Sequence, residues 1–295
     1  MPKHRRPSAP LPDVFIGSHA VHEGLLTARQ LRGPHVERVL QGVYRPAWVP
    51  LTHTLQCRAA SLVLPDDAVI TGPSGATVLG LRLASAGDDV MAALTEGPRV
   101  PRRSGVRLRR VAEPRPGGRV VDGLRLAHPR RLAFDAAAGL PLHEATAALD
   151  ALVRHRLVDL GDLRQWLTSC HDNNVRAVRR AADLVDPRAE SLPESITRVH
   201  LVEAGFDVVP QYRVRDGSRV VARVDLALPE LKIAVEYDGR WHEGDARRAL
   251  DNDRLAALRA AGWTVIIVTA ELLRDRRRLV GAVAAAVAER QALRR

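Results

Sequence analysis

RVDLALPELKIAVEYD, residues 223–238, is the stretch that decides the fold of the C-terminal third of this chain. Its apolar, β-branched composition indicates two strands, at about 220–228 and 231–237. Pro229-Glu230 lies between them and is typical of a tight turn. The stretch therefore predicts a β-hairpin.

Two carboxylates of this hairpin are predicted to face one another. Side chains alternate between the faces of a strand, so Glu236 and Asp238 share a polar face in the second strand. The tight turn pairs Asp225 with approximately Ala234 or Val235, so Glu236 lies directly across from Asp225 or one diagonal step away, within ~5–8 Å. We expect Asp225 and Glu236 to converge on one side of the hairpin, with Asp238 beyond them.

Such a pair of acids suggests a divalent cation. Two carboxylates at that separation repel one another and are unfavourable to desolvate. Mg²⁺ prefers oxygen ligands and keeps waters and substrate phosphate in its other positions, where it assists attack on a phosphodiester. The spacing predicts Mg²⁺, or Mn²⁺, held by Asp225 and Glu236. The alternative of an exposed strand residue and a turn at Asp238-Gly239 stays open, although aspartate is disfavoured in a strand such as that of Asp225.

Three further residues are candidates, each with a structural alternative. Glu194 could complete the acidic site, or could close a capping box with Ser191 at a helix N-terminus. His242 could position a water or be a surface histidine. Arg254 could assist the reaction, or form with Asp253 a solvated helical pair.

The elements around the hairpin follow the order α-β-β-β-α-β-α. They are predicted at residues 191–204, 206–212, 220–228, 231–237, 246–261, 263–268 and 271–292.

The motifs of this region resemble a domain-of-unknown-function family related to very-short-patch-repair endonucleases, of the PD-(D/E)XK class. The matching segments are ESLPES (190–195) with Arg198, RVDLA (223–227), AVEYDG (234–239), Trp241-His242, Asp253-Arg254 and AGWTV (261–265). The resemblance implies a restriction-endonuclease-like fold, with a metal site at Asp225 and Glu236 and Glu194 nearby. Asp238 stands where the class usually has lysine, so Arg254 or His242 would replace the lysine. The zinc-binding residues of the very-short-patch enzymes are not found.

The N-terminal part predicts a small winged-helix-like unit. A short helix follows Thr27, a second is expected at His35–Leu40, and a strand follows the turn after it. LLTARQL (25–31) and VLQGVYRP (39–46) resemble the antitoxin-type winged-helix region of abortive-infection systems. The candidate nucleic-acid contacts are Arg29, Arg38 and Arg45. The alternative is a helical cap with a solvated arginine face.

The chain divides by pattern into four segments. They are a disordered basic arm (1–12), the winged-helix-like unit (13–55), a mixed α/β middle region of unknown role (56–186) and the endonuclease-like domain (187–295). Asp186-Pro187 is the predicted linker, because proline ends a helical run.

The composition favours a polyanionic partner. The 295 residues carry 45 Lys and Arg against 34 Asp and Glu, a formal net charge of +11, which is typical of nucleic-acid-binding chains. Two distant cysteines do not suggest a disulfide framework. We expect no signal peptide and no membrane segment, and therefore a cytoplasmic protein.

Together these patterns predict an α/β (α+β) protein that is a metal-dependent DNA endonuclease, hydrolysing phosphodiester bonds in DNA repair or phage defence. The alternative is a non-catalytic, DNA-binding regulator of antitoxin type with a degenerate nuclease fold. A toxin–antitoxin or self-association partner is a third interpretation that one sequence does not decide.

Overall fold

The computed structural model describes residues 10–95, 100–111, 117–238 and 245–294, with side chains from 245 to 252 left out. The protein belongs to the predicted α/β class, with helices and three sheets in the described residues. Contacts divide it into two compact units. One comprises Met1–Ala136 and Leu157–Asn173, and the other Ala137–Arg156 and Asn174–Arg295.

The first unit begins with a three-stranded sheet of order β1-β3-β2. Its elements are β1 (Phe15–Ile16), α1 (Gly17–His22), α2 (Ala28–Leu31), β2 (Val36–Leu40) and β3 (Val43–Pro46). Thr27 caps α2 as predicted: its Oγ1 accepts from Gln30 N at 3.2 Å, while Gln30 Oε1 accepts from Thr27 N at 2.9 Å. The helix start is thus a local property of the sequence.

The helix expected at His35–Leu40 was wrong, because most of this segment is strand β2. It pairs antiparallel with β3, and Val36 and Leu40 are buried. The turn between the strands places Gly42 at φ 80°, which favours glycine. A helix of six residues gains few hydrogen bonds of its own, whereas pairing with β3 satisfies the backbone of the whole segment.

The rest of the first unit surrounds a five-stranded sheet of order β6-β5-β4-β8-β7. The strands are β4 (Val69–Ile70), β5 (Val90–Thr95), β6 (Val106–Val111), β7 (Gly117–Val121) and β8 (Leu124–Ala127); the helices are α3 (His53–Ser61), α4 (Gly72–Val78), α5 (Pro129–Ala137) and α7 (Leu160–Ser169). The core beneath α3 joins Cys57 and Ala60 to Val90 and Leu126. In the strand order given above, β6 is one edge of this sheet.

The second unit contains a four-stranded sheet of order β12-β11-β10-β9. The elements are α6 (Leu142–Arg154), α8 (Val175–Asp183), α9 (Leu192–Glu203), β9 (Val209–Asp216), β10 (Arg219–Leu228), the 3-10 turn η1 (Pro229–Leu231), β11 (Ile233–Asp238), α10 (Asp245–Ala260), β12 (Thr264–Thr269), α11 (Ala270–Arg274) and α12 (Arg276–Ala292). The predicted order from α9 onward is confirmed with one difference. The last helix is interrupted at Asp275, whose Oδ1 accepts from Arg278 N at 3.1 Å and caps α12.

Two helices from the predicted middle region belong to this second unit. Helix α6 packs on α9, where Asp150 Oδ2 accepts from Arg198 Nη2 at 2.8 Å. Both side chains are almost fully buried. A buried ion pair is strongly destabilised if one partner is removed, so this contact ties α6 to the C-terminal elements.

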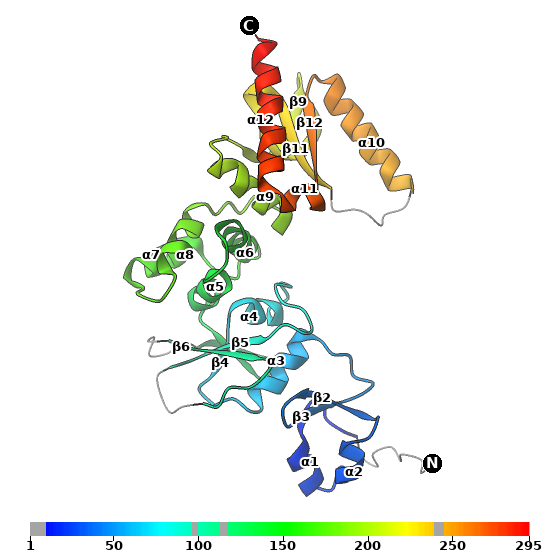
Figure 1. The fold of residues 1–295 in the computed structure, drawn as a ribbon, viewed down its shortest axis with the longest axis vertical. Helices are drawn as coiled ribbons and strands as arrows, with labels where there is room; N and C mark the ends of the chain where they lie inside the picture. The colour runs from blue at the N-terminus through cyan, green and yellow to red at the C-terminus, as the bar shows by residue number, and fades with distance from the viewer. Residues whose placement is uncertain (1–9, 96–99, 112–116, 239–244, 295) are drawn as a thin grey trace. The chain divides into compact units, whose positions relative to one another are not determined.

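Strand β11 is buried on both faces. Ile233 and Val235 pack with α9 and α12, whereas Ala234 packs with Leu258 of α10. Figure 1 shows α12 and α10 flanking the sheet. The face predicted to be polar is therefore covered by α10, because β11 pairs in parallel with β12 and such strands carry helices on both sides.

Candidate active site

The register of β10 and β11 places the two predicted acids opposite one another. Leu226 pairs with Val235 and Ala227 with Ala234, so one step further Asp225 faces Glu236. The pairing of Asp225 with Ala234 or Val235 was therefore wrong by at least one residue. The turn is longer than expected, since η1 is followed by Lys232 in the left-handed conformation at φ 52°.

A cavity of about 340 Å³ opens beside this pair. Its lining includes the predicted Asp225, Glu236, Asp238, Glu194 and Arg254. It also includes Glu190, Gln211, Arg223, Tyr237, Leu255 and Ile267. Five predicted site residues thus line one cavity, while His242 lies outside the described residues.

Glu236 is the most perturbed acid of the cavity. Only 4% of the residue is exposed, and burial together with the neighbouring Asp225 raises its pKa to about 7. Arg254 opposes both effects: its Nη2 and Nη1 donate to Glu236 Oε2 and Oε1 at 2.9 and 3.3 Å. Arg254 on α10 is therefore the cation that neutralises Glu236 in the protein alone.

Asp225 is half-buried and has one backbone partner. Its Oδ2 accepts from Tyr237 N at 3.0 Å, which fixes the carboxylate against β11. Burial raises the pKa of Asp225, and the Tyr237 bond partly counteracts this. Both acids of the pair thus favour protonation relative to ordinary carboxyls, which is common at functional sites.

Glu194 lies in the first turn of α9 and also lines the cavity. Ser191 Oγ accepts from Glu194 N at 3.3 Å and caps α9. The Glu194 carboxylate accepts from Ser191 Oγ at 2.8 Å, Glu190 N at 2.9 Å and Gln211 Nε2 at 2.8 Å. Ser191 is thus the cap of the helix, while the Glu194 carboxylate is held by three donors at the edge of the cavity.

Sequence reasoning missed three polar residues of the cavity. Arg223 donates to both oxygens of Glu190 at 2.8 and 3.0 Å, and Gln211 holds Glu194. Both Glu190 and Arg223 lie within the motifs and could have been considered. Gln211 has φ 51°, an uncommon conformation for a residue other than glycine that sequence does not reveal.

The donor set fits a hard divalent cation bound through two protein carboxylates. Mg²⁺ is commonly held by one or two carboxylates together with water and substrate oxygens. Asp225 and Glu236 can supply the two carboxylates. Within the described part of the chain no group of three or more His, Cys, Asp or Glu is placed to hold a metal, so an all-protein cage is not formed there. A cation bound by Glu236 would share this carboxylate with Arg254 or compete with it.

The candidate contacts of the N-terminal part differ in exposure. Arg29 and Arg38 are exposed, as a nucleic-acid contact requires. Arg45 is 9% exposed and pairs with Glu37, while its Nη1 donates to Pro46 O at 3.3 Å and to Val49 O. Arg45 therefore holds the segment after β3 and is withdrawn as a nucleic-acid contact.

Among all residues described, no helix combines the length and apolar character that crossing a bilayer requires.

Comparison with curated proteins places the chain among mycobacterial relatives. "Uncharacterized protein Rv2248" of Mycobacterium tuberculosis strain ATCC 25618 / H37Rv is 30% identical over 197 residues, 66% of this chain and 68% of that protein. "Uncharacterized protein MT2308" of strain CDC 1551 / Oshkosh matches with the same identity and coverage. The chain belongs to the family of these two proteins. No family model matches it, and no solved structure matches it significantly.

Proposed function

We propose that this protein is a metal-dependent nuclease that hydrolyses phosphodiester bonds, with DNA as its substrate. The observation that carries the proposal is the opposition of Asp225 and Glu236 across β10 and β11, inside a cavity that also contains two arginines. Buried acids without enough counter-charge destabilise a fold, and their retention in a cavity favours a functional role. The order of elements and this register also support the proposed relation to very-short-patch-repair endonucleases.

Asp225 and Glu236 would hold Mg²⁺ or Mn²⁺, which would supply an activated water and neutralise charge on the phosphate. Arg254, released from Glu236, would be available to bind a phosphate oxygen as a planar donor. Glu194, oriented by Gln211 at 2.8 Å, would accept a hydrogen bond from water in the cavity. Asp238 is exposed at the end of β11 and occupies the place where the class usually has lysine.

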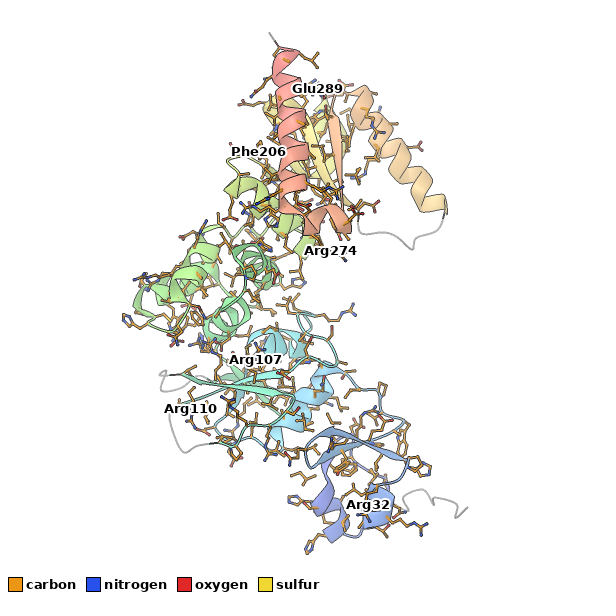
Figure 2. The ribbon with its side chains drawn as sticks, in the orientation of Figure 1. Arg32, Arg107, Arg110, Phe206, Arg274 and Glu289 are labelled. Carbon is orange, nitrogen blue, oxygen red and sulfur yellow. The ribbon has the colours of Figure 1, made fainter. Side chains whose placement is uncertain are left out.

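The proposal is tested by titrating Mg²⁺ and Mn²⁺ into wild type and Asp225→Asn with duplex, mismatched and single-stranded DNA, and with RNA. We expect cleavage that needs the metal and is lost in the variant. Glu289→Gln is the control, because Glu289 is an exposed acid of α12 outside the cavity lining (Figure 2). Cleavage retained by Asp225→Asn would contradict the assignment of the site.

A second function is favoured by the Glu236–Arg254 ion pair at 2.9 Å, which neutralises one acid without a metal. In this alternative the protein is a DNA-binding regulator of antitoxin type whose C-terminal site has no catalytic activity. It predicts salt-sensitive DNA binding without cleavage, and unchanged or tighter binding by Asp225→Asn. In either case we propose a cytoplasmic protein of DNA repair or phage defence.

A further inference from the structure

A second groove lies in the first unit, within residues that the proposed nuclease site does not use. It has a volume of about 450 Å³ and runs along β6, the edge strand of the five-stranded sheet. Its lining residues are Leu64, Asp89, Val100, Pro101, Arg102, Arg103, Val106, Arg107, Leu108 and Arg110. Figure 2 shows Arg107 and Arg110 spaced along this strand. The groove is therefore built mainly from β6 and the segment that leads into it, with Leu64 and Asp89 contributed by other parts of the unit.

The charges of the groove are strongly unequal. Four arginines line it against one acid, Asp89, within the described lining. Arg102 and Arg107 are exposed, and Arg107 forms no ion pair with any residue that the structure describes. Arg103 has a buried Nε without a hydrogen-bond partner. Within the lining, the positive charge thus exceeds the negative charge, and Arg102 and Arg107 present theirs to solvent.

Arg109, on the same strand, has a structural role and serves as a comparison for the groove arginines. Its Nη1 donates to Asp135 Oδ1 at 2.7 Å, and its guanidinium lies 5.6 Å from the centre of the Phe134 ring. Asp135 is fully buried. Arg109 is neutralised by a buried carboxylate, whereas Arg107, two residues earlier, has no ion pair with any residue that the structure describes.

The floor of the groove is aliphatic. Leu64, Val106 and Leu108 are half-buried there between the arginines. Duplex DNA presents mainly phosphates to such a surface, whereas a single strand also presents bases and sugars that can cover apolar side chains. Guanidinium groups bind phosphate oxygens in a bidentate manner.

From this combination we propose that the groove along β6 binds single-stranded nucleic acid, with phosphates on Arg102, Arg103, Arg107 and Arg110 and bases or sugars on the aliphatic floor. Each nucleotide carries one charge together with an apolar face, which matches a groove lined by arginine and aliphatic side chains together better than an acidic peptide does. This binding needs no metal and is separate from the proposed phosphodiester hydrolysis.

The test measures binding of the full-length protein to labelled single-stranded DNA and RNA oligonucleotides by fluorescence anisotropy, in EDTA and over a range of salt. EDTA excludes cleavage, so failure of the nuclease proposal would not affect the result. For Arg102→Gln/Arg107→Gln we expect a Kd raised about tenfold, and a salt slope reduced by about 1.4, since each lost phosphate contact removes about 0.7 for a single strand.

Two variants separate a binding role from loss of fold or of general charge. Arg119→Gln/Arg125→Gln removes two exposed arginines from β7 and β8 at the other edge of the sheet, and should leave the Kd within about twofold. Asp89→Asn removes the acid of the groove and should tighten binding about two- to threefold, a direction that damage to the fold would not produce.

Three results would overturn the proposal. They are equal weakening by the two double variants, an unchanged Kd in Arg102→Gln/Arg107→Gln, and tighter binding of duplex DNA or of poly-glutamate than of single strands at equal charge. The last result would assign the groove to a duplex backbone or to an acidic peptide instead.

Discussion

Each unit contains a cluster of acids and arginines with buried members, but the two clusters are balanced differently. In the first unit Asp135 Oδ1 accepts from Arg109 at 2.7 Å and Arg131 at 2.9 Å, and Oδ2 accepts from Thr71 at 2.8 Å and Arg131 at 3.2 Å. Arg131 also pairs with Asp172 and lies 4.4 Å from the centre of the Phe134 ring. Every carboxylate oxygen of Asp135 has two donors.

The cavity of the second unit has the opposite balance. Its lining combines five acids, Glu190, Glu194, Asp225, Glu236 and Asp238, with two arginines. Burial and mutual repulsion raise the pKa of Glu236 to about 7. Removing one partner from a compensated buried cluster destabilises a fold, whereas undercompensated buried acids lower stability by themselves. Under the proposed function the first cluster is structural and the second is functional.

The largest effect is expected for Asp135→Asn. It leaves Arg131, 1% exposed, with too little negative charge in the core, which is expected to destabilise the protein by about 3–5 kcal/mol. The measurement is unfolding in guanidinium chloride followed by circular dichroism. Asp122→Asn is the control, because Asp122 is 73% exposed and its contact with Arg58 is 3.9 Å, so a change within ~0.5 kcal/mol is expected. A similar stability of the two variants would show that the Asp135 cluster is not structural.

The pH dependence of stability tests the cavity. The pKa of Glu236 is raised from 4.5 to about 7 in the folded state, so the folded protein holds the proton more tightly. The resulting stabilisation is present below pH 4.5 and is lost as the pH rises to 7, amounting to about 3 kcal/mol at 1.36 kcal/mol per unit. Unfolding of wild type and Glu236→Gln from pH 4.5 to 8 should give a difference that changes by this amount. A constant difference would mean that Glu236 titrates normally.

The smallest effect is expected for Asp225→Asn at pH 8. Removing one of two facing carboxylates relieves repulsion and the desolvation of a charge, so we expect stabilisation by about 1–2 kcal/mol. Unfolding midpoints measured in EDTA provide the value, and Glu289→Gln serves as the matched acid outside the cavity. Destabilisation by Asp225→Asn would show that the pair of acids stabilises the fold, as Asp135 is expected to do. The two clusters would then not differ in role.

Much of the C-terminal region could be predicted because its signals are local. Alternation in residues 231–237 indicates a strand, and the hairpin places Asp225 and Glu236 on neighbouring strands. The register that pairs Leu226 with Val235 puts both acids on the same face, whereas a shift of one residue would put them on opposite faces. Ser191 identifies the start of α9 by its capping pattern. The segment 35–40 was misassigned because its apolar spacing suits a short helix as well as a strand, and only pairing with β3 decides between them.

The sequence by itself determined the order of elements in the C-terminal region, the caps of α2 and α9, and the pair of acids on one hairpin, since these depend on neighbours a few residues away. The tertiary structure alone decided the partner of Glu236, its raised pKa and the attachment of α6 to α9. Arg254 reaches Glu236 from α10, and Arg198 reaches Asp150 across 48 positions of the chain. Burial and ion pairing depend on which distant segments pack together, and no local pattern specifies that.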